Sequence, residues 1–156
     1  MSNNEKKERT LLDMATINLK TAKSMYKFKT DDELFLNIVA YHIQQAIEMA
    51  IKHELELEGK TYPYSHDIGE LIELSSDLAE FEEYEKLYLT ASQISEFESH
   101  TRYDKNYLAS AKMVGILGPI AEKLLSFVRK YEADNQKKAQ QELTQQTQQT
   151  NTQSVK

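Results

Sequence analysis

The octet HTRYDKNY, residues 100–107, places a histidine, an arginine and two tyrosines within eight positions of an otherwise acidic region. Arginine offers a planar fork for phosphate oxygens, histidine exchanges protons near neutral pH, and an aromatic ring stacks on a nucleobase. Three interpretations are therefore open. The octet is a nucleotide-holding clamp, the remnant of an active site, or the join between two helices.

A second set of polar residues follows one line on a helix expected from residue 31 to about residue 58. Tyr41, Gln45, Glu48 and Lys52 recur at steps of three and four, with Gln44 beside them, so they share one helix face. This line is the first candidate binding surface. Periodicity alone favours a simpler interpretation, in which Glu48 and Lys52 form an exposed pair worth about 0.3 kcal/mol.

The histidines give no sign of a metal site. None has a partner at ligand spacing, and no HExxH motif is present,. His42, at the edge of an apolar face, is expected to be partly buried and hydrogen-bonded, and the structural interpretation of His66 is capping or packing beside Asp67. A glycine-rich phosphate loop and a GxSxG motif are also absent. We predict no metal, no cofactor and no catalytic residue.

The elements that must position these residues are helices. With only four Gly, two Pro and no alternating strand pattern, the chain is predicted to be all-α, an up-and-down bundle of four main helices plus a short helix. Capping-box patterns at Thr10–Asp13 and Thr30–Glu33 predict helix starts near Thr10 and Asp31. Gly59 is expected to stop the second helix, and Asp67 to cap a third.

The second helix is apolar over a wide arc, which predicts that it lies at the centre of the bundle. A further helical region is expected over residues 81–99, and the last helix is expected to start after Asp104, which is suited to capping it. Gly118–Pro119 lies inside that last helix. Because an interior proline costs roughly 3 kcal/mol, a kink or local break is predicted there.

The composition divides the chain into three parts. Residues 1–9 are expected to be a flexible N-terminus and residues 10–133 the helical bundle. Residues 134–156 form a polar Gln/Thr-rich tail with eight Gln, predicted to be disordered because it has almost no apolar surface to bury,.

There is no Cys, no signal-peptide pattern and no apolar run near the ~18 residues of a membrane span,. We expect a cytoplasmic protein without membrane contact.

The net charge of −6 is unevenly distributed along the chain. Residues 1–30 carry +4, residues 31–104 carry −14, and residues 105–156 carry +4. Such an acidic middle region repels phosphate, so general electrostatic binding of RNA is not expected. A local pocket built from arginine and lysine remains compatible with this balance.

Residues 41–74, YHIQQAIEMAIKHELELEGKTYPYSHDIGELIEL, followed by Arg102-Tyr103, resemble the HEPN domain family of small helical bundles. The order and spacing of the matched elements cover most of residues 10–131. These elements are His42, Gln44-Gln45-Ala46, Glu48, Lys52, Gly59, Ser65-His66-Asp67-Ile68, Leu71 and Arg102-Tyr103.

The resemblance distinguishes two branches of that family. Ribonuclease members carry an arginine followed four to six residues later by a histidine, but positions 106–109 after Arg102 are Asn, Tyr, Leu and Ala. Tyr107 stands at the plus-five position, and a phenol with an ordinary pKa near ~10 is a poor base at neutral pH. The alternative function, a metal-independent toxin-like ribonuclease, would have to use Arg102 with His100.

The nucleotidyltransferase-associated branch matches better, through its QQA-x-E, S/T-H-D and R-Y patterns. That resemblance implies a nucleotide-binding or partner-binding module, the companion of a nucleotidyltransferase in a toxin–antitoxin type pair. Arg102 would hold a phosphate, Tyr103 or Tyr107 a base, and Lys52 would add positive charge. His66 lies in the S/T-H-D pattern and completes the predicted mononucleotide site.

The family resemblance also implies a homodimer, which an excess of apolar and aromatic residues on the second and last helices favours. Two other interpretations stay open. Arg102 pairs with an acid such as Glu48 inside the bundle, or the protein is a non-catalytic interaction scaffold.

Overall fold

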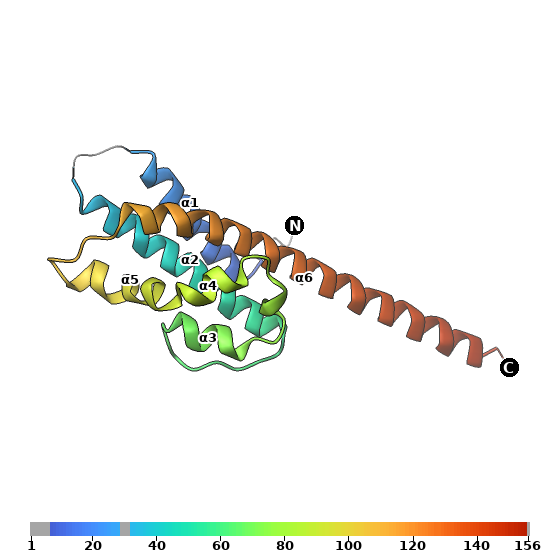
Figure 1. The fold of residues 1–156 in the computed structure, drawn as a ribbon. Helices are drawn as coiled ribbons and strands as arrows, with labels where there is room; N and C mark the ends of the chain where they lie inside the picture. Colours follow the sequence, from blue (N-terminus) through green and yellow to red (C-terminus); the bar gives the residue numbers. More distant parts are fainter. Residues whose placement is uncertain (1–6, 29–31, 156) are drawn as a thin grey trace.

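A computed structural model describes residues 7–28 and 32–155, and within these ranges all regular secondary structure is helical (Figure 1). The elements are α1 (Leu11–Tyr26), α2 (Phe35–Leu57), α3 (Ile68–Leu74), the 3-10 turn η1 (Leu78–Glu80), α4 (Tyr84–Leu89), α5 (Ala91–Tyr103) and α6 (Ala111–Gln153). The long helices α1, α2, α5 and α6 alternate in direction, and α3, η1 and α4 form an excursion between α2 and α5. The predicted all-α bundle is confirmed.

The first predicted capping box is present. The Asp13 amide donates to Thr10 Oγ1 at 3.1 Å, and the Thr10 amide donates to Asp13 Oδ2 at 3.0 Å. The second box involves Thr30 and Asp31, which lie outside the described residues. α2 begins at Phe35 rather than near Asp31. The Leu34 amide donates to Asp32 Oδ1 at 3.0 Å, and such a local side-chain bond competes with a helical conformation.

The end of α2 and the start of α3 follow the predicted signals. Gly59 has a φ of +73°, and the Lys60 amide donates to the Leu55 carbonyl at 2.9 Å, as in a Schellman motif,. Asp67 Oδ1 accepts from the Glu70 amide at 3.1 Å and caps α3. The connection between them brings residues 62–66 back beside α2.

α2 is the central helix, because it packs against α1, α3, α5 and α6. Its apolar core residues are Val39, Ala40, Ile43, Ala46, Ile47, Ala50, Ile51 and Leu55. It also buries five polar side chains, Asn37, Gln44, Glu48, His53 and Glu54. His42 is half-buried and lies 2.8 Å from Asn18 Oδ1, as predicted, and burial lowers its pKa. The buried polar groups are what build the sites described below.

The last helix does not start after Asp104. α6 begins at Ala111, and the Ser110 hydroxyl accepts from the Met113 amide at 3.3 Å. Asp104 ends α5 instead, and its side chain accepts from the Asn106 amide at 2.9 Å. Residues 104–110 therefore form a connection, and a side chain from α2 holds it.

That side chain is Asn37, which is buried. Its Nδ2 donates to the Tyr107 carbonyl at 2.7 Å, and its Oδ1 accepts from the Ala109 amide at 2.7 Å. The side-chain amide of Asn37 therefore forms hydrogen bonds with two backbone groups of the connection, which follow it by 70 and 72 residues in the sequence. This contact fixes how α5 joins α6.

α6 continues through Pro119 without a break, so the predicted local break is wrong. The proline removes one backbone donor, but Leu117, Ile120 and Ala121 beside it are buried in the core. This packing holds the helix on both sides of the missing bond.

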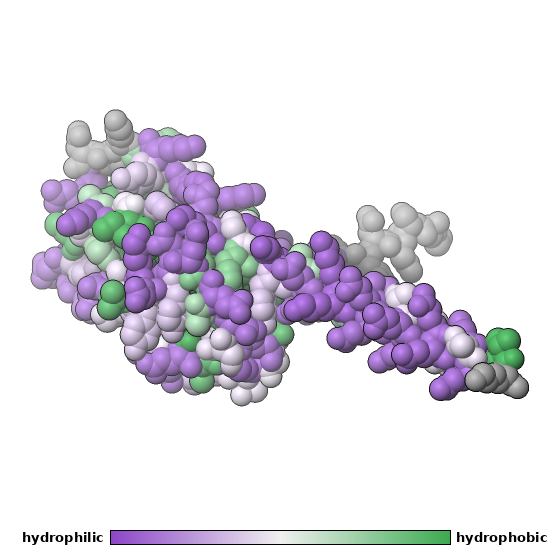
Figure 2. Space-filling view, turned by 45° about the vertical axis from the view of Figure 1, so that its right-hand side comes forward, coloured by the Kyte–Doolittle hydropathy of each residue, from purple (hydrophilic) through white to green (hydrophobic). Residues whose placement is uncertain are grey.

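The tail predicted to be disordered is helical as far as Gln153 in the structure. Its Gln, Lys, Glu and Ala residues form helices well, and no Gly or Pro follows Pro119,. The side chains of residues 136–155 are exposed, and Figure 2 shows them as a mostly hydrophilic projection from the bundle. None of the described helices combines the length and the apolar character needed to cross a membrane.

Candidate functional site

A buried carboxylate on α2 is the centre of the predicted site. Glu48 is 4% exposed. Its Oε2 accepts from Gln44 Nε2 at 2.5 Å, and its Oε1 accepts from Lys52 Nζ at 2.8 Å. The ring Nδ1 of His66 lies 3.1 Å from both carboxylate oxygens. The interpretation of Glu48 and Lys52 as an exposed pair is therefore wrong, because the two side chains are only 6% and 12% exposed.

His66 connects this carboxylate to α5. Its Nε2 lies 4.0 Å from Glu98 Oε1. Glu98 in turn binds Arg102, which donates from Nη2 to the carboxylate and from Nε to the Glu98 backbone carbonyl at 2.8 Å. One continuous line of ionisable groups therefore runs through Lys52, Glu48, His66, Glu98 and Arg102. We call these five residues the polar network.

Each end of the polar network is a cation against a tyrosine ring. Arg102 Cζ lies 5.1 Å from the ring centroid of Tyr41 and 4.9 Å from that of Tyr103. At the other end, Lys52 Nζ lies 5.6 Å from the ring centroid of Tyr62. These distances are within the range of cation–π attraction. Tyr103 is 76% exposed and so leaves an accessible surface beside Arg102.

The charges of the polar network nearly cancel. It contains the carboxylates of Glu48 and Glu98, the cations of Lys52 and Arg102, and one imidazole. A phosphate approaching Arg102 must therefore compete with the carboxylate of Glu98 that the guanidinium already binds. Such a site favours an anion that also brings a ring to stack on tyrosine.

The structure brings four of the five predicted site residues together. Lys52, His66 and Arg102 belong to the polar network, and Tyr103 lies against Arg102. Tyr107 does not join them. Its ring lies 5.3 Å from that of His100, and burial, followed by the nearby Glu96 carboxylate, raises its pKa further from neutrality.

Glu98 is the network member whose role the sequence interpretation missed. Arg102 pairs with it, as the structural interpretation expected of an acid, although the acid is Glu98 and not Glu48, the example given there. The available signal was the i, i+4 spacing of an acid and a base on one helix. His66 does not cap α3, since Asp67 does so.

A last helix that starts after Asp104 would place Arg102 and Tyr103 just before its positive end, and this expected placement is wrong. They lie in the last turn of α5, at the negative end of a helix dipole. This end stabilises the guanidinium cation and supplies no free amides for a phosphate. An anion at this position depends on the side chain of Arg102 itself.

The pair required by the ribonuclease alternative is not assembled within one chain. His100 and Arg102 are two residues apart on α5 and do not face each other. His100 Nδ1 lies 4.0 Å from Asp104 Oδ2, and its ring packs on Tyr107. Arg102 instead faces Glu98 and Tyr41.

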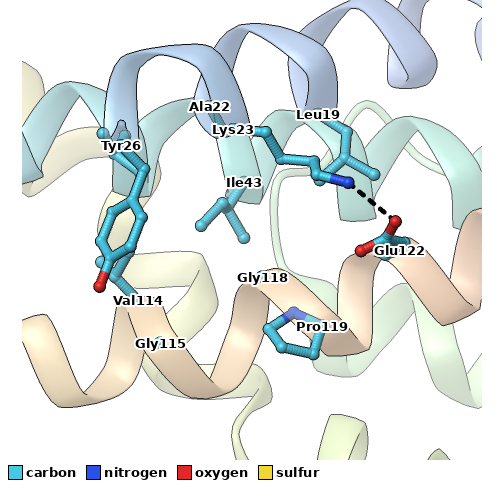
Figure 3. A pocket seen from close by; sticks show the side chains of 11 residues that line it. Leu19, Ala22, Lys23, Tyr26, Ile43, Val114, Gly115, Gly118, Pro119 and Glu122 are labelled. Atoms are coloured by element: carbon cyan, nitrogen blue, oxygen red, sulfur yellow. Dashed lines mark hydrogen bonds and ion pairs between the residues drawn. The ribbon is translucent and has the colours of Figure 1, made fainter. Parts of the chain in front are cut away.

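A cavity of about 310 Å³ lies elsewhere, between α1, α2 and α6 (Figure 3). Its wall is mostly apolar, and the ion pair of Lys23 Nζ with Glu122 Oε1, at 2.8 Å, lies on its rim. It contains no member of the polar network. The polar network and this apolar cavity are therefore separate features.

Comparison with known proteins agrees with the pattern of matched residues. No curated protein and no solved structure matches the chain. The family model of the HEPN domain matches residues 8–131, which include α1 to α5, the part of α6 up to Tyr131 and all members of the polar network. The chain therefore belongs to the HEPN domain family and is, at the level of that family, a nucleotide- or RNA-related or partner-binding module.

Proposed function

We propose that this protein binds a mononucleotide at the Arg102 end of the polar network and acts without catalysis, as the companion of a nucleotidyltransferase in a toxin–antitoxin type pair. One observation carries the proposal. The Arg102 guanidinium lies close to two tyrosine rings, at 5.1 Å from the Tyr41 centroid and 4.9 Å from the Tyr103 centroid, and Glu98 binds it through Nε and Nη2. A phosphate and a base need such a combination of a cation and flat rings.

The polar network also supports a prediction about strength. Because Glu98 competes for Arg102, binding is weak in the wild-type protein, and removing the competing charge strengthens it. In Glu98→Gln the guanidinium keeps a neutral partner of the same shape. We expect this variant to bind a nucleotide roughly three to ten times more tightly.

Replacing Arg102 with alanine is expected to weaken the binding of AMP and ATP at least about tenfold, because it removes the charged hydrogen-bond donor. Calorimetric titration of the full chain measures this change. Arg129→Ala is the matched control, since Arg129 lies on α6, is exposed and donates to Thr16 Oγ1. It should bind both nucleotides like the wild type.

Two outcomes would oppose the proposal. If millimolar AMP and ATP give no heat with the wild type, and Arg102→Ala lowers the urea midpoint, Arg102 is a structural residue. If the purified protein cleaves single-stranded RNA without metal, and both Arg102→Ala and His100→Ala abolish cleavage, the ribonuclease function replaces this one.

The proposal includes a homodimer. Large apolar side chains are exposed at the C-terminal end of α1, at the start of α2 and near the start of α6, namely Tyr26, Phe28, Leu34, Ile38, Leu108 and Ile116. Figure 1 places these three helix ends at the same end of the bundle. Exposed apolar groups gathered in this way favour a protein interface.

Light scattering of the full chain at micromolar concentration is expected to report about twice the chain mass of 18.1 kDa. Ile38→Glu, which places a charge among these groups, should shift the mass toward that of one chain. A mass of one chain at every concentration of the wild type would refute the dimer.

A further inference from the structure

Three carboxylates meet where the end of α2 lies against the turn before η1. The side chains of Glu54, Glu58 and Asp77 have oxygens within 4.8 Å of one another. Glu54 is fully buried, and the other two are partly buried. We call these three residues the acidic cluster. It shares no residue with the polar network, and the inference below does not depend on nucleotide binding.

Two members of the acidic cluster are well supplied with hydrogen-bond donors. Glu58 Oε1 accepts from the Ser75 hydroxyl at 2.8 Å, and Glu58 Oε2 lies 2.7 Å from Lys60 Nζ. Asp77 Oδ2 accepts from the Tyr131 hydroxyl at 2.5 Å. The backbone amide of Asp77 donates to Glu58 as well, at 2.9 Å.

Glu54 differs from both. Among the described residues, no hydrogen-bond donor contacts either of its carboxylate oxygens, and the nearby Ser75 hydroxyl donates to Glu58 instead. With all three carboxylates ionised, the acidic cluster and the ammonium of Lys60 together carry a charge of −2. Buried charge of this kind is retained only with a proton or a cation to balance it.

We propose that Glu54, Glu58 and Asp77 bind a hard divalent cation of the Ca²⁺ class. The available donors are all oxygens, as such an ion prefers. Ca²⁺ accepts oxygen ligands in flexible geometry at about 2.3–2.6 Å, whereas Mg²⁺ requires a near-ideal octahedron at about 2.0–2.1 Å. One oxygen from each of the three residues lies within 4.8 Å of the others, close enough for all three to ligate one ion, and three carboxylates from separate segments suit the more flexible ion.

The charge and the neighbouring side chains agree with this occupant. One divalent ion balances the charge of −2 and takes the place of the proton through which Glu54 can bond to Glu58. Lys60 also donates to the Leu74 carbonyl at 2.8 Å and to the Ser76 hydroxyl. Lys60 therefore keeps partners when an ion takes its place at Glu58 Oε2.

A proton is the competitor for the same position. Burial, and then the Glu58 carboxylate, raise the pKa of Glu54 to about 8. Burial alone would raise the pKa of Glu58 too, but bonds from Glu54, Lys60 and backbone amides hold it well below its usual range. The Glu54–Glu58 pair therefore holds a proton more strongly than two separate carboxyl groups do. Cation binding must release this proton and must strengthen as the pH rises.

The test uses the full chain, freed of metal with a chelator and dialysed. Ca²⁺ at a fixed concentration, about one hundred times its Kd at pH 8.5, is expected to raise the unfolding midpoint by roughly 5 °C at that pH. The same concentration should raise it by less at pH 6, and Mg²⁺ is expected to do less at either pH. Calorimetry in two buffers that differ in ionisation enthalpy should detect release of protons when the ion binds at pH 7.

Glu54→Gln keeps the shape of the protonated acid and should abolish the effect of Ca²⁺. Asp77→Asn should weaken it, and Glu142→Gln on the exposed part of α6 should leave it unchanged. The proposal is overturned if Ca²⁺ does not stabilise the wild type, while raising the pH lowers its midpoint and Glu54→Gln removes that dependence. A proton alone then occupies the cluster. Equal stabilisation of Glu54→Gln by Ca²⁺ also overturns it.

Discussion

Replacing Glu48 with glutamine is expected to lower the free energy of unfolding by about 3–5 kcal/mol, because the change leaves the Lys52 ammonium in the interior without its counterion. The Lys52 side chain is only 12% exposed and lies 2.8 Å from Glu48. Gln44 and His66 also lose the carboxylate that both contact. The effect should therefore exceed that of any surface ion pair.

Urea unfolding followed by circular dichroism measures this loss. Glu122→Gln is the matched control, since Glu122 pairs with Lys23 but both side chains are more than half exposed. It should cost under about 1 kcal/mol. Adding Lys52→Met to Glu48→Gln should recover part of the stability. A change in Glu48→Gln as small as in the control would show that Glu48 does not anchor a buried ion pair.

Asn37→Ala is expected to lower the free energy of unfolding by about 2–4 kcal/mol, because it leaves two backbone groups without a partner. The Ala109 amide and the Tyr107 carbonyl both bond to the Asn37 side chain at 2.7 Å. Ala109 is 5% exposed, so water does not easily replace the lost bond.

Hydrogen exchange provides the readout specific to this contact. The Ala109 amide should exchange much faster in Asn37→Ala, while amides in the centre of α2 should change only with the overall stability. Asn106→Ala, an exposed change in the same connection, is the control and should be close to neutral. Unchanged protection of Ala109 would mean that another acceptor holds that amide.

The fold was predictable where a local signal decides the outcome. The Thr10 capping box, the stop at Gly59 and the cap at Asp67 each depend on residues within a few positions, and all three are present. The start of the last helix is not determined by nearby residues alone. Asp104 and Ser110 are both good capping residues, and Asn37, far earlier in the sequence, pins the connection between them.

The candidate site was predictable in its residues but not in its burial. The spacing of Glu48 and Lys52 shows that they share a helix face, yet only the return of residues 62–66 and the position of α5 determine that this face is covered. The same limit applies to Glu54. Glu54 is 23 residues before Asp77 in the sequence. The turn that brings their carboxylates together has no charge pattern from which this contact could be predicted.

The unbroken course of α6 has a consequence for anything attached to its far end. From Tyr131, the last residue bonded to the acidic cluster, to Gln153 the helix adds 22 residues, or roughly 33 Å at about 1.5 Å per residue,. Each residue also turns the helix by about 100°. A group at the tip is therefore held at a fixed distance from the bundle and at a fixed angle around the helix axis. Inserting seven residues before the tip would lengthen the spacing and nearly keep the direction, whereas inserting two would turn the group toward the opposite side.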